Sequence, residues 1–147
     1  MATSNAATTY LENKLLSFIF KNNAGSFATP GNSIYVGLAT AVSDAEAGSL
    51  TEVNTSTQDA NYTRQQVNAA GWTLASSSTD QQTVTNAANI EYSASSGVAT
   101  YTVTHAFVAD ASTGGNILFV GALDASKAIA SGDIFRINAG NLTIEFK

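Results

Sequence analysis

The feature that most restricts the fold is the succession of short apolar runs and turn residues after residue 30. Runs rich in Val, Ile, Thr, Tyr and Phe are separated by clusters of Gly, Asn, Ser and Asp. In the clearest run, residues 99–109, one face of an extended chain would carry Tyr101, Val103, His105 and Phe107. Such alternation between turns is the pattern of β-strands. The sequence predicts an all-β fold, mainly an antiparallel β-sandwich of jelly-roll-like form.

One N-terminal α-helix precedes this β-region. Thr9 and Glu12 have the spacing of a capping box, and helical periodicity follows them. We expect the helix at residues 10–22, behind a polar arm at residues 1–9. Its apolar side chains would cover an arc of roughly 200°, about twice what a helix lying on one sheet needs. Either the helix is wedged deeply into its own core, or part of it faces a second surface.

Low charge is the main compositional feature of the chain. Charged residues make up 12 % and hydrophobic residues 44 % of the 147 positions. The missing charge is replaced by neutral polar residues, which cost little to desolvate against a neighbour, whereas Lys and Glu are depleted from interface cores. This composition fits an ordinary soluble domain as well as a subunit covered by neighbours. Length and pattern indicate a single domain, 1–147, with residues 31–147 forming the β-part.

Several classes of function are disfavoured by the sequence. The net charge is −5 and the six basic residues are scattered, which argues against nucleic-acid binding. The chain contains no cysteine, so disulfides and thiolate metal sites are excluded. Apolar runs are shorter than the ~20 residues of a membrane span, so no membrane partner is expected. The first ten residues lack the pattern of a secretory signal, which is compatible with assembly in the cytoplasm.

Residues that could carry chemistry are few. His105 is the single histidine and lies in an apolar strand pattern, which favours a hydrogen-bonding role in a core or between subunits over a role as general base. Asp44, Glu46, Glu52 and Asp59 fall in one region but lack the spacing of a calcium loop. The sequence therefore predicts a non-enzymatic protein without catalytic residues, metal ligands or a cofactor.

The remaining candidate residues point to contacts. Tyr10, Leu16 and Phe20 belong to the over-apolar helix and are candidate assembly contacts. Arg64 lies in a weakly charged region and is expected to pair with a carboxylate, within the chain or across an interface. Trp72 is the only tryptophan, and it reads as a core or interface anchor or, alternatively, as a platform for a sugar.

Five segments, in this order and spanning most of the chain, resemble small structural proteins encoded in the virion gene clusters of tailed bacteriophages. Such proteins are described as head-decoration, minor structural or tail-fibre-like proteins. The segments are TYLENKLLSFIFKN, SIYVGLATAVSDAEAG, YTRQQV, VTHAFVADASTGGNILFVGAL and SGDIFRINAGNLTIEF.

This resemblance implies a β-sandwich with a leading helix, located in the virion and assembled in the host cytoplasm. The leading hypothesis is a capsid decoration or cement protein, a dimer or trimer that binds and stabilises the major capsid lattice. The alternative is a component of the tail, collar or baseplate with tail or neck proteins as partners. A hypothesis of another class is a carbohydrate-binding or receptor-binding module that uses Trp72.

Overall fold

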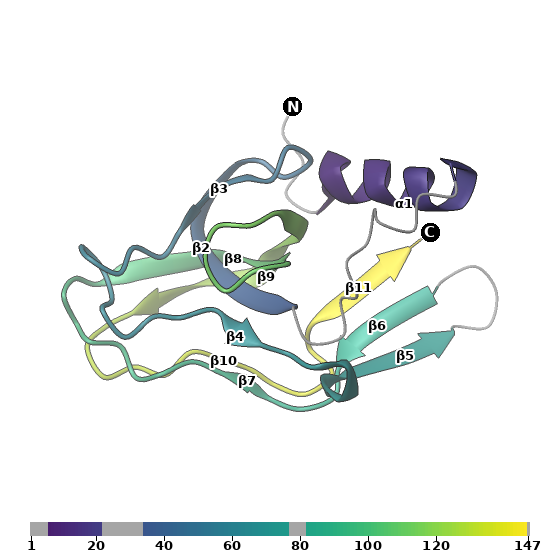
Figure 1. The fold of residues 1–147 in the computed structure, drawn as a ribbon. Coiled ribbons are helices and arrows are strands. Elements are labelled where there is room, and N and C mark those ends of the chain that lie inside the picture. Colours follow the sequence, from purple (N-terminus) through teal and green to yellow (C-terminus); the bar gives the residue numbers. More distant parts are fainter. Residues whose placement is uncertain (1–5, 22–33, 77–81, 147) are drawn as a thin grey trace.

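The computed structural model describes residues 6–21, 34–76 and 82–146, which form one α-helix, a short 3-10 helix and three β-sheets (Figure 1). The helices are α1 (Thr9–Lys21) and a 3-10 turn at Ala69–Gly71; the strands are β1 (Ala6–Ala7), β2 (Tyr35–Asp44), β3 (Ser49–Glu52), β4 (Gln65–Gln66), β5 (Trp72–Ser76), β6 (Gln82–Asn86), β7 (Ile90–Glu91), β8 (Tyr101–Ala109), β9 (Ile117–Ile129), β10 (Arg136–Ile137) and β11 (Thr143–Phe146).

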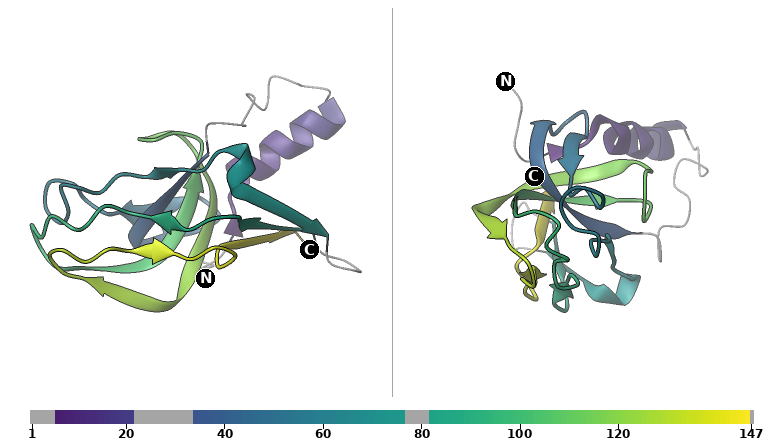
Figure 2. Two further views of the ribbon diagram at one scale, coloured as in Figure 1. Left: turned by 90° about the horizontal axis from the view of Figure 1, so that it is seen from below. Right: turned by 90° about the vertical axis from the view of Figure 1, so that its left-hand side faces the viewer.

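The largest sheet has six strands in the order β1-β9-β8-β2-β3, with β4 also paired to β2. All of its pairs are antiparallel, and the sheet curls into a half-barrel (Figure 2). Two smaller sheets, β10-β7 and β11-β6-β5, lie beside it. The fold class predicted from sequence, mainly antiparallel β with one N-terminal helix, is confirmed.

The half-barrel buries side chains on both of its faces. Tyr101, Val103 and Ala106 belong to the main core cluster, whereas Phe107 belongs to a second cluster. The register between β8 and β9 shifts between Val103 and His105, and an irregularity of this kind changes which side chains face the core. The expectation that Tyr101, Val103, His105 and Phe107 share one face is therefore wrong.

Two stacked tyrosines fasten the main core to β2. The rings of Tyr62 and Tyr92 lie 6.0 Å apart with only 6° between their planes. The hydroxyl of Tyr92 donates to the carbonyl of Val36 at 2.8 Å, and the hydroxyl of Tyr62 accepts the N–H of Leu38 at 2.9 Å. These bonds satisfy backbone groups that would be costly to bury unpaired. Burial raises the pKa of both phenols, so they stay protonated.

The helix begins at Thr9, one residue before the predicted start, and Thr8 caps it. The Oγ1 atom of Thr8 accepts the N–H of Leu11 at 3.4 Å and donates to the carbonyl of Ile117 at 2.6 Å. Thr8 is buried at 2 % exposure, while Glu12 is exposed. The predicted cap at Thr9 is wrong, because the chain enters the helix along β9 and buries the earlier threonine. Residue 22 and the first five residues of the predicted arm lie outside the described residues.

Several other boundaries differ from the sequence pattern. The sequence allows one helical turn at residues 43–48, but residues 45–48 form the turn of the β2–β3 hairpin, in which Asp44 accepts the N–H groups of Glu46 and Ala47. The composition of residues 50–61 predicts a long surface loop, but this segment begins with most of β3. The pattern predicts a hairpin strand at residues 117–123, whereas β9 extends to Ile129.

Candidate functional site

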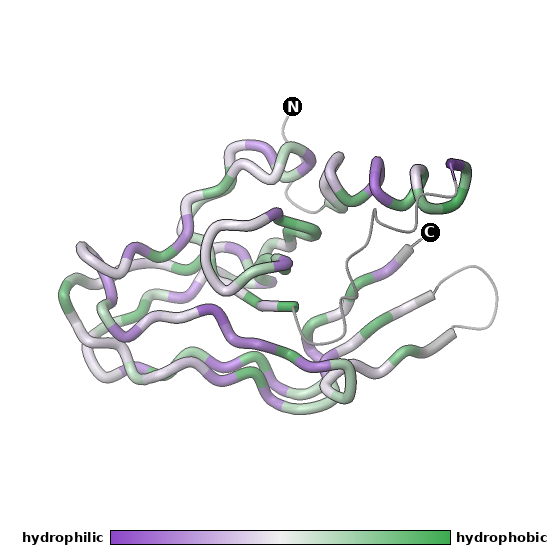
Figure 3. The backbone as a smooth tube through the Cα atoms, viewed as in Figure 1, coloured by the Kyte–Doolittle hydropathy of each residue, from purple (hydrophilic) through white to green (hydrophobic). Residues whose placement is uncertain are grey.

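The most conspicuous surface feature is the helix α1, which leaves most of its large apolar side chains in solvent. Only Leu11 is buried within it: Leu15 is 37 % exposed, Leu16 54 %, Phe18 48 %, Ile19 58 % and Phe20 74 %. Figure 3 shows the hydrophobic positions that recur along this helix. We call Leu15, Leu16, Ile19 and Phe20 the α1 face; their i, i+4 spacing forms two parallel ridges.

The helix is fixed to the body at its first turn. The N–H of Thr8 donates to the carbonyl of Leu118 at 2.9 Å, and the N–H of Thr9 donates to that of Glu46 at 2.8 Å. Beyond this turn, α1 extends away from the half-barrel, and its last turns project from the body (Figures 1 and 2). The hypothesis of a helix wedged deeply into its own core is therefore wrong. Of the candidate contacts, Tyr10 is 36 % exposed, with the Lys14 ammonium 5.5 Å from its ring centre.

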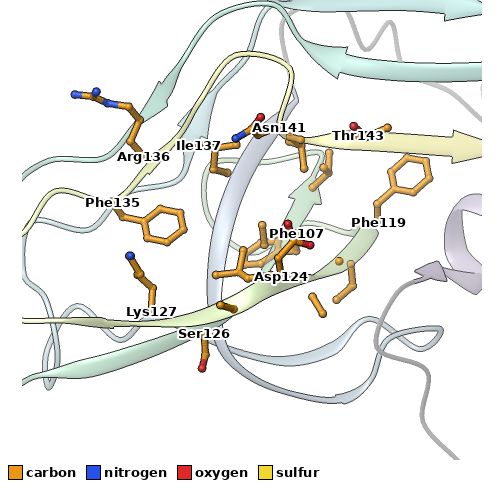
Figure 4. A pocket seen from close by; sticks show the side chains of 18 of the residues that line it. Phe107, Phe119, Asp124, Ser126, Lys127, Phe135, Arg136, Ile137, Asn141 and Thr143 are labelled. Atoms are coloured by element: carbon orange, nitrogen blue, oxygen red, sulfur yellow. The ribbon is translucent and has the colours of Figure 1, made fainter.

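A large groove opens between β9 and residues 133–145. Its volume is about 1640 Å³. Apolar side chains contribute to both walls, including Leu123 on β9 and Phe135 and Leu142 opposite, and these three are partly buried and pack against the main core. Figure 4 shows Phe135 pointing into this space, whereas Ser126 and Arg136 point away from it.

Arg64 joins three separate parts of the chain. It forms a two-pronged ion pair with Glu52 on β3, with both nitrogen–oxygen distances at 2.8 Å. Its Nη1 atom donates to the carbonyls of Ala111 and Gly114 in the β8–β9 turn, at 2.7 and 2.8 Å. The guanidinium lies 5.0 Å from the centre of the Phe107 ring. The side chain is 5 % exposed, and its hydrogen bonds to Glu52 raise the pKa of the guanidinium. The predicted pairing with a carboxylate is confirmed as an internal one.

Asp59 organises the loops at the opposite end of the half-barrel from α1. Its carboxylate accepts the N–H of Ser96 at 2.9 Å, the N–H of Asn61 at 3.0 Å and the hydroxyl of Tyr101 at 2.9 Å. Burial raises the pKa of this carboxyl, but the three donors outweigh burial and hold the pKa below its ordinary value of 3.8. The hydrogen bonds of Asp59 thus hold its polar segment to the segment of Ser96 and to β8.

This lowered pKa predicts that the protein loses stability in acid. The stabilisation by ionised Asp59 is fully present above the pKa of the unfolded chain and is lost as the pH falls through the lower folded-state pKa. We expect the free energy of unfolding to decline below about pH 4. In Asp59→Asn the stability at neutral pH should be lower and the acid decline smaller. Denaturant unfolding between pH 2 and pH 7 measures both; parallel pH profiles for the two proteins would exclude this role.

Trp72 lies at the start of β5 and is half-buried. Its Nε1–H donates to the carbonyl of Val67 at 3.3 Å, and its ring packs against the main core. Because both its polar atom and part of its apolar surface have partners within the chain, the geometry favours the anchoring role over the sugar platform. A contact of Trp72 with another protein stays a prediction, as it does for Arg64.

His105 lies in the middle of β8, and its Nδ1 atom is 2.8 Å from the hydroxyl of Thr104. Burial lowers the pKa of the imidazole, which therefore stays neutral at pH 7. Within the described residues, no three His, Asp or Glu side chains converge as they would around a metal ion. The same part of the chain contains no helix long and apolar enough to cross a membrane.

Comparison with known protein families matches residues 6–145 to the family described as podophage GP4 fiber I protein gp80. The chain belongs to this family. A search of curated proteins found no match. The fibre protein is thus a non-enzymatic structural component of a phage virion, associated with the tail.

Family membership confirms the tailed-phage virion resemblance and corrects one part of the sequence interpretation. Capsid decoration, the leading hypothesis, is not supported, because the family is described as a fibre protein. The tail component that stood as the alternative agrees with the family description. The partners of the fibre protein are accordingly among the tail proteins of the virion rather than the capsid lattice.

Sequence reasoning missed the groove and most of the internal polar network. Asn86, 1 % exposed, donates through Nδ2 to the carbonyls of Ala88 and Asn138, and its Oδ1 accepts the N–H of Leu142. Asp59 was considered only as a weak calcium ligand. A single Asn or Asp amid many polar residues carries no signal of its own, since its donors come from distant segments.

Proposed function

We propose that this chain is a non-enzymatic structural subunit of the fibre. The subunit assembles into a homo-oligomer and attaches to neighbouring virion proteins through the α1 face. The observation that carries the proposal is the exposure of Leu16, Ile19 and Phe20, each more than half in solvent. The backbone hydrogen bonds of Thr8 and Thr9 fix the first turn of their helix to the body. Apolar surface of this kind is stabilised by about 25 cal/mol per Å² when a partner covers it. Contiguous exposed apolar patches mark interaction sites.

The interior of the chain supports a structural role as well. Each buried side-chain nitrogen or oxygen of the described residues has a hydrogen-bond partner. The side chains of Glu52, Asp59 and Arg64 all form hydrogen bonds within the chain. They therefore stabilise the fold and are not free to bind a substrate. A rigid body with an adhesive helix is what a structural subunit requires.

The test replaces two residues of the α1 face with glutamine, which favours helix: Leu16→Gln with Phe20→Gln. Because both side chains are exposed, the free energy of unfolding should change by no more than about 0.5 kcal/mol per residue. Losing two apolar contacts of about 1.5 kcal/mol or more each should reduce incorporation at least tenfold. The measurement is the number of copies per purified particle, relative to another virion protein.

A matched control is Val98→Gln, which removes an apolar side chain that is 53 % exposed in a loop outside α1. Its copy number per particle should equal that of the unaltered protein. Normal incorporation of the double variant would contradict the proposal. The copy number of the unaltered protein also separates the two virion locations, because a tail assembly takes a small set of copies and a decorated capsid takes hundreds.

A further inference from the structure

The fibre protein carries two large surface features, an apolar one and one lined by apolar and polar side chains alike. One is the α1 face, and the other is the groove between β9 and residues 133–145. Of the described residues, those of α1 do not line the groove, although Ala6 and Ala7, just before the helix, lie at one end of it. We propose that the α1 face of one copy docks in the groove of a second copy. This inference rests on the proposed structural function and names its partner.

The size of the groove favours a helix over a small molecule. Pockets for small ligands measure about 300–1,000 Å³, and this groove measures about 1640 Å³. A 13-residue helix is about 20 Å long and at least 10 Å wide, which corresponds to a cylinder on the order of 1,600 Å³. The helix α1 has 13 residues. The groove can therefore receive most of such a helix along β9.

The chemistry of the two surfaces also matches. Leu123, Phe135 and Leu142 are half-buried at the mouth of the groove, so the main core is incompletely covered there. The paired ridges of the α1 face would complete this cover, as amphipathic helices do when they bind apolar grooves. The helix carries two lysines and one glutamate, a net charge of +1. The groove lining carries Lys127 against three carboxylates, Asp124, Asp133 and Glu145. With Arg136, which points away from the groove and pairs with Glu91, these charges sum to −1.

A contact between two copies would use a different surface on each of them. The two surfaces differ, so each subunit would offer its helix to one neighbour and its groove to another. A contact of this head-to-tail kind produces a closed ring or an open filament, depending on the rotation between subunits. The contact uses one helix face and is smaller than a standard interface, so it gains its strength from several copies engaged together.

The absence of cysteine makes a cross-linking test clean. Two full-length variants are made separately, Ile19→Cys on the α1 face and Thr143→Cys on the groove wall. The residues at both positions are exposed. The two are mixed under mild oxidation and run on a non-reducing gel after tagging one of them to change its size. We expect the mixed dimer to be the dominant cross-linked species. Thr55→Cys, in an exposed loop outside the groove, replaces Thr143→Cys as the control and should give no mixed dimer above background.

Two results would overturn the inference. Dimers of Ile19→Cys alone, without a mixed species, would mean that helices pair with helices. Monomers in every mixture would mean that the groove does not receive a second copy. If either variant fails to fold, Phe20→Cys with Asn141→Cys repeats the test at neighbouring positions. A chain that enters particles normally through the α1 face but fails to cross-link would sink this inference and leave the proposed function standing.

Discussion

Arg64→Ala should lower the free energy of unfolding by about 3–5 kcal/mol, the loss expected when one partner of a buried ion pair is removed. The substitution leaves Glu52 without its cation and the turn carbonyls of Ala111 and Gly114 without a donor. It also removes the guanidinium that covers the ring of Phe107. Denaturant unfolding followed by fluorescence or circular dichroism measures the change, which corresponds to a fall in melting temperature of roughly 10 °C.

The chain contains a matched control for this prediction. Arg136 pairs with Glu91 at 2.6 Å, but the two side chains are 48 % and 47 % exposed. An ion pair in solvent contributes about 0–1 kcal/mol, so Arg136→Ala should be close to neutral. Both substitutions remove an arginine paired with a glutamate, and they differ mainly in burial. Equal losses for the two variants would contradict the expectation that the buried contacts of Arg64 stabilise the fold more than the exposed pair of Arg136 does.

The second large effect is expected at Gly37, in the middle of β2. Gly37 pairs with Phe107 on β8, and the ring of Phe107 lies over its Cα. A Cβ atom at this position would stand 2.2 Å from Cζ of Phe107, whose side chain is 1 % exposed. We expect Gly37→Ala to cost about 3 kcal/mol, the upper end of the usual overpacking range.

Two further variants test the cause of this cost. Gly121 lies on β9 with no atom within 4 Å of a Cβ built there, so Gly121→Ala should be neutral or slightly stabilising. Phe107→Leu removes the ring edge that the methyl group introduced by Gly37→Ala would strike. In that background Gly37→Ala should cost at least about 1 kcal/mol less than in the unaltered protein, the coupling expected of residues in contact. Additive costs would mean that the ring is not the obstacle.

Local features of the fold could be read from the sequence because their causes are local. Alternation of apolar residues placed most strands, and the turns at Gly114-Gly115, Gly132 and Gly140 adopt positive φ, which glycine allows without strain. The helix was predicted within one residue of its observed start for the same reason. Its excess of apolar side chains left two interpretations open, a helix wedged into its own core and a helix that partly faces a second surface, and counting those side chains could not decide between them.

Long-range pairing was decided by the tertiary structure alone. The register shift in β8 separates Val103 from Phe107, although their spacing in the sequence is that of one face. The donors to Asp59 include Tyr101, which is 42 positions away in the sequence. Arg64 pairs with Glu52, although other carboxylates lie in the same region of the sequence. Periodicity and turn propensity act over a few residues. The packing of distant segments decides which partner a polar side chain has. It also decides that α1 stays exposed and that the groove is open.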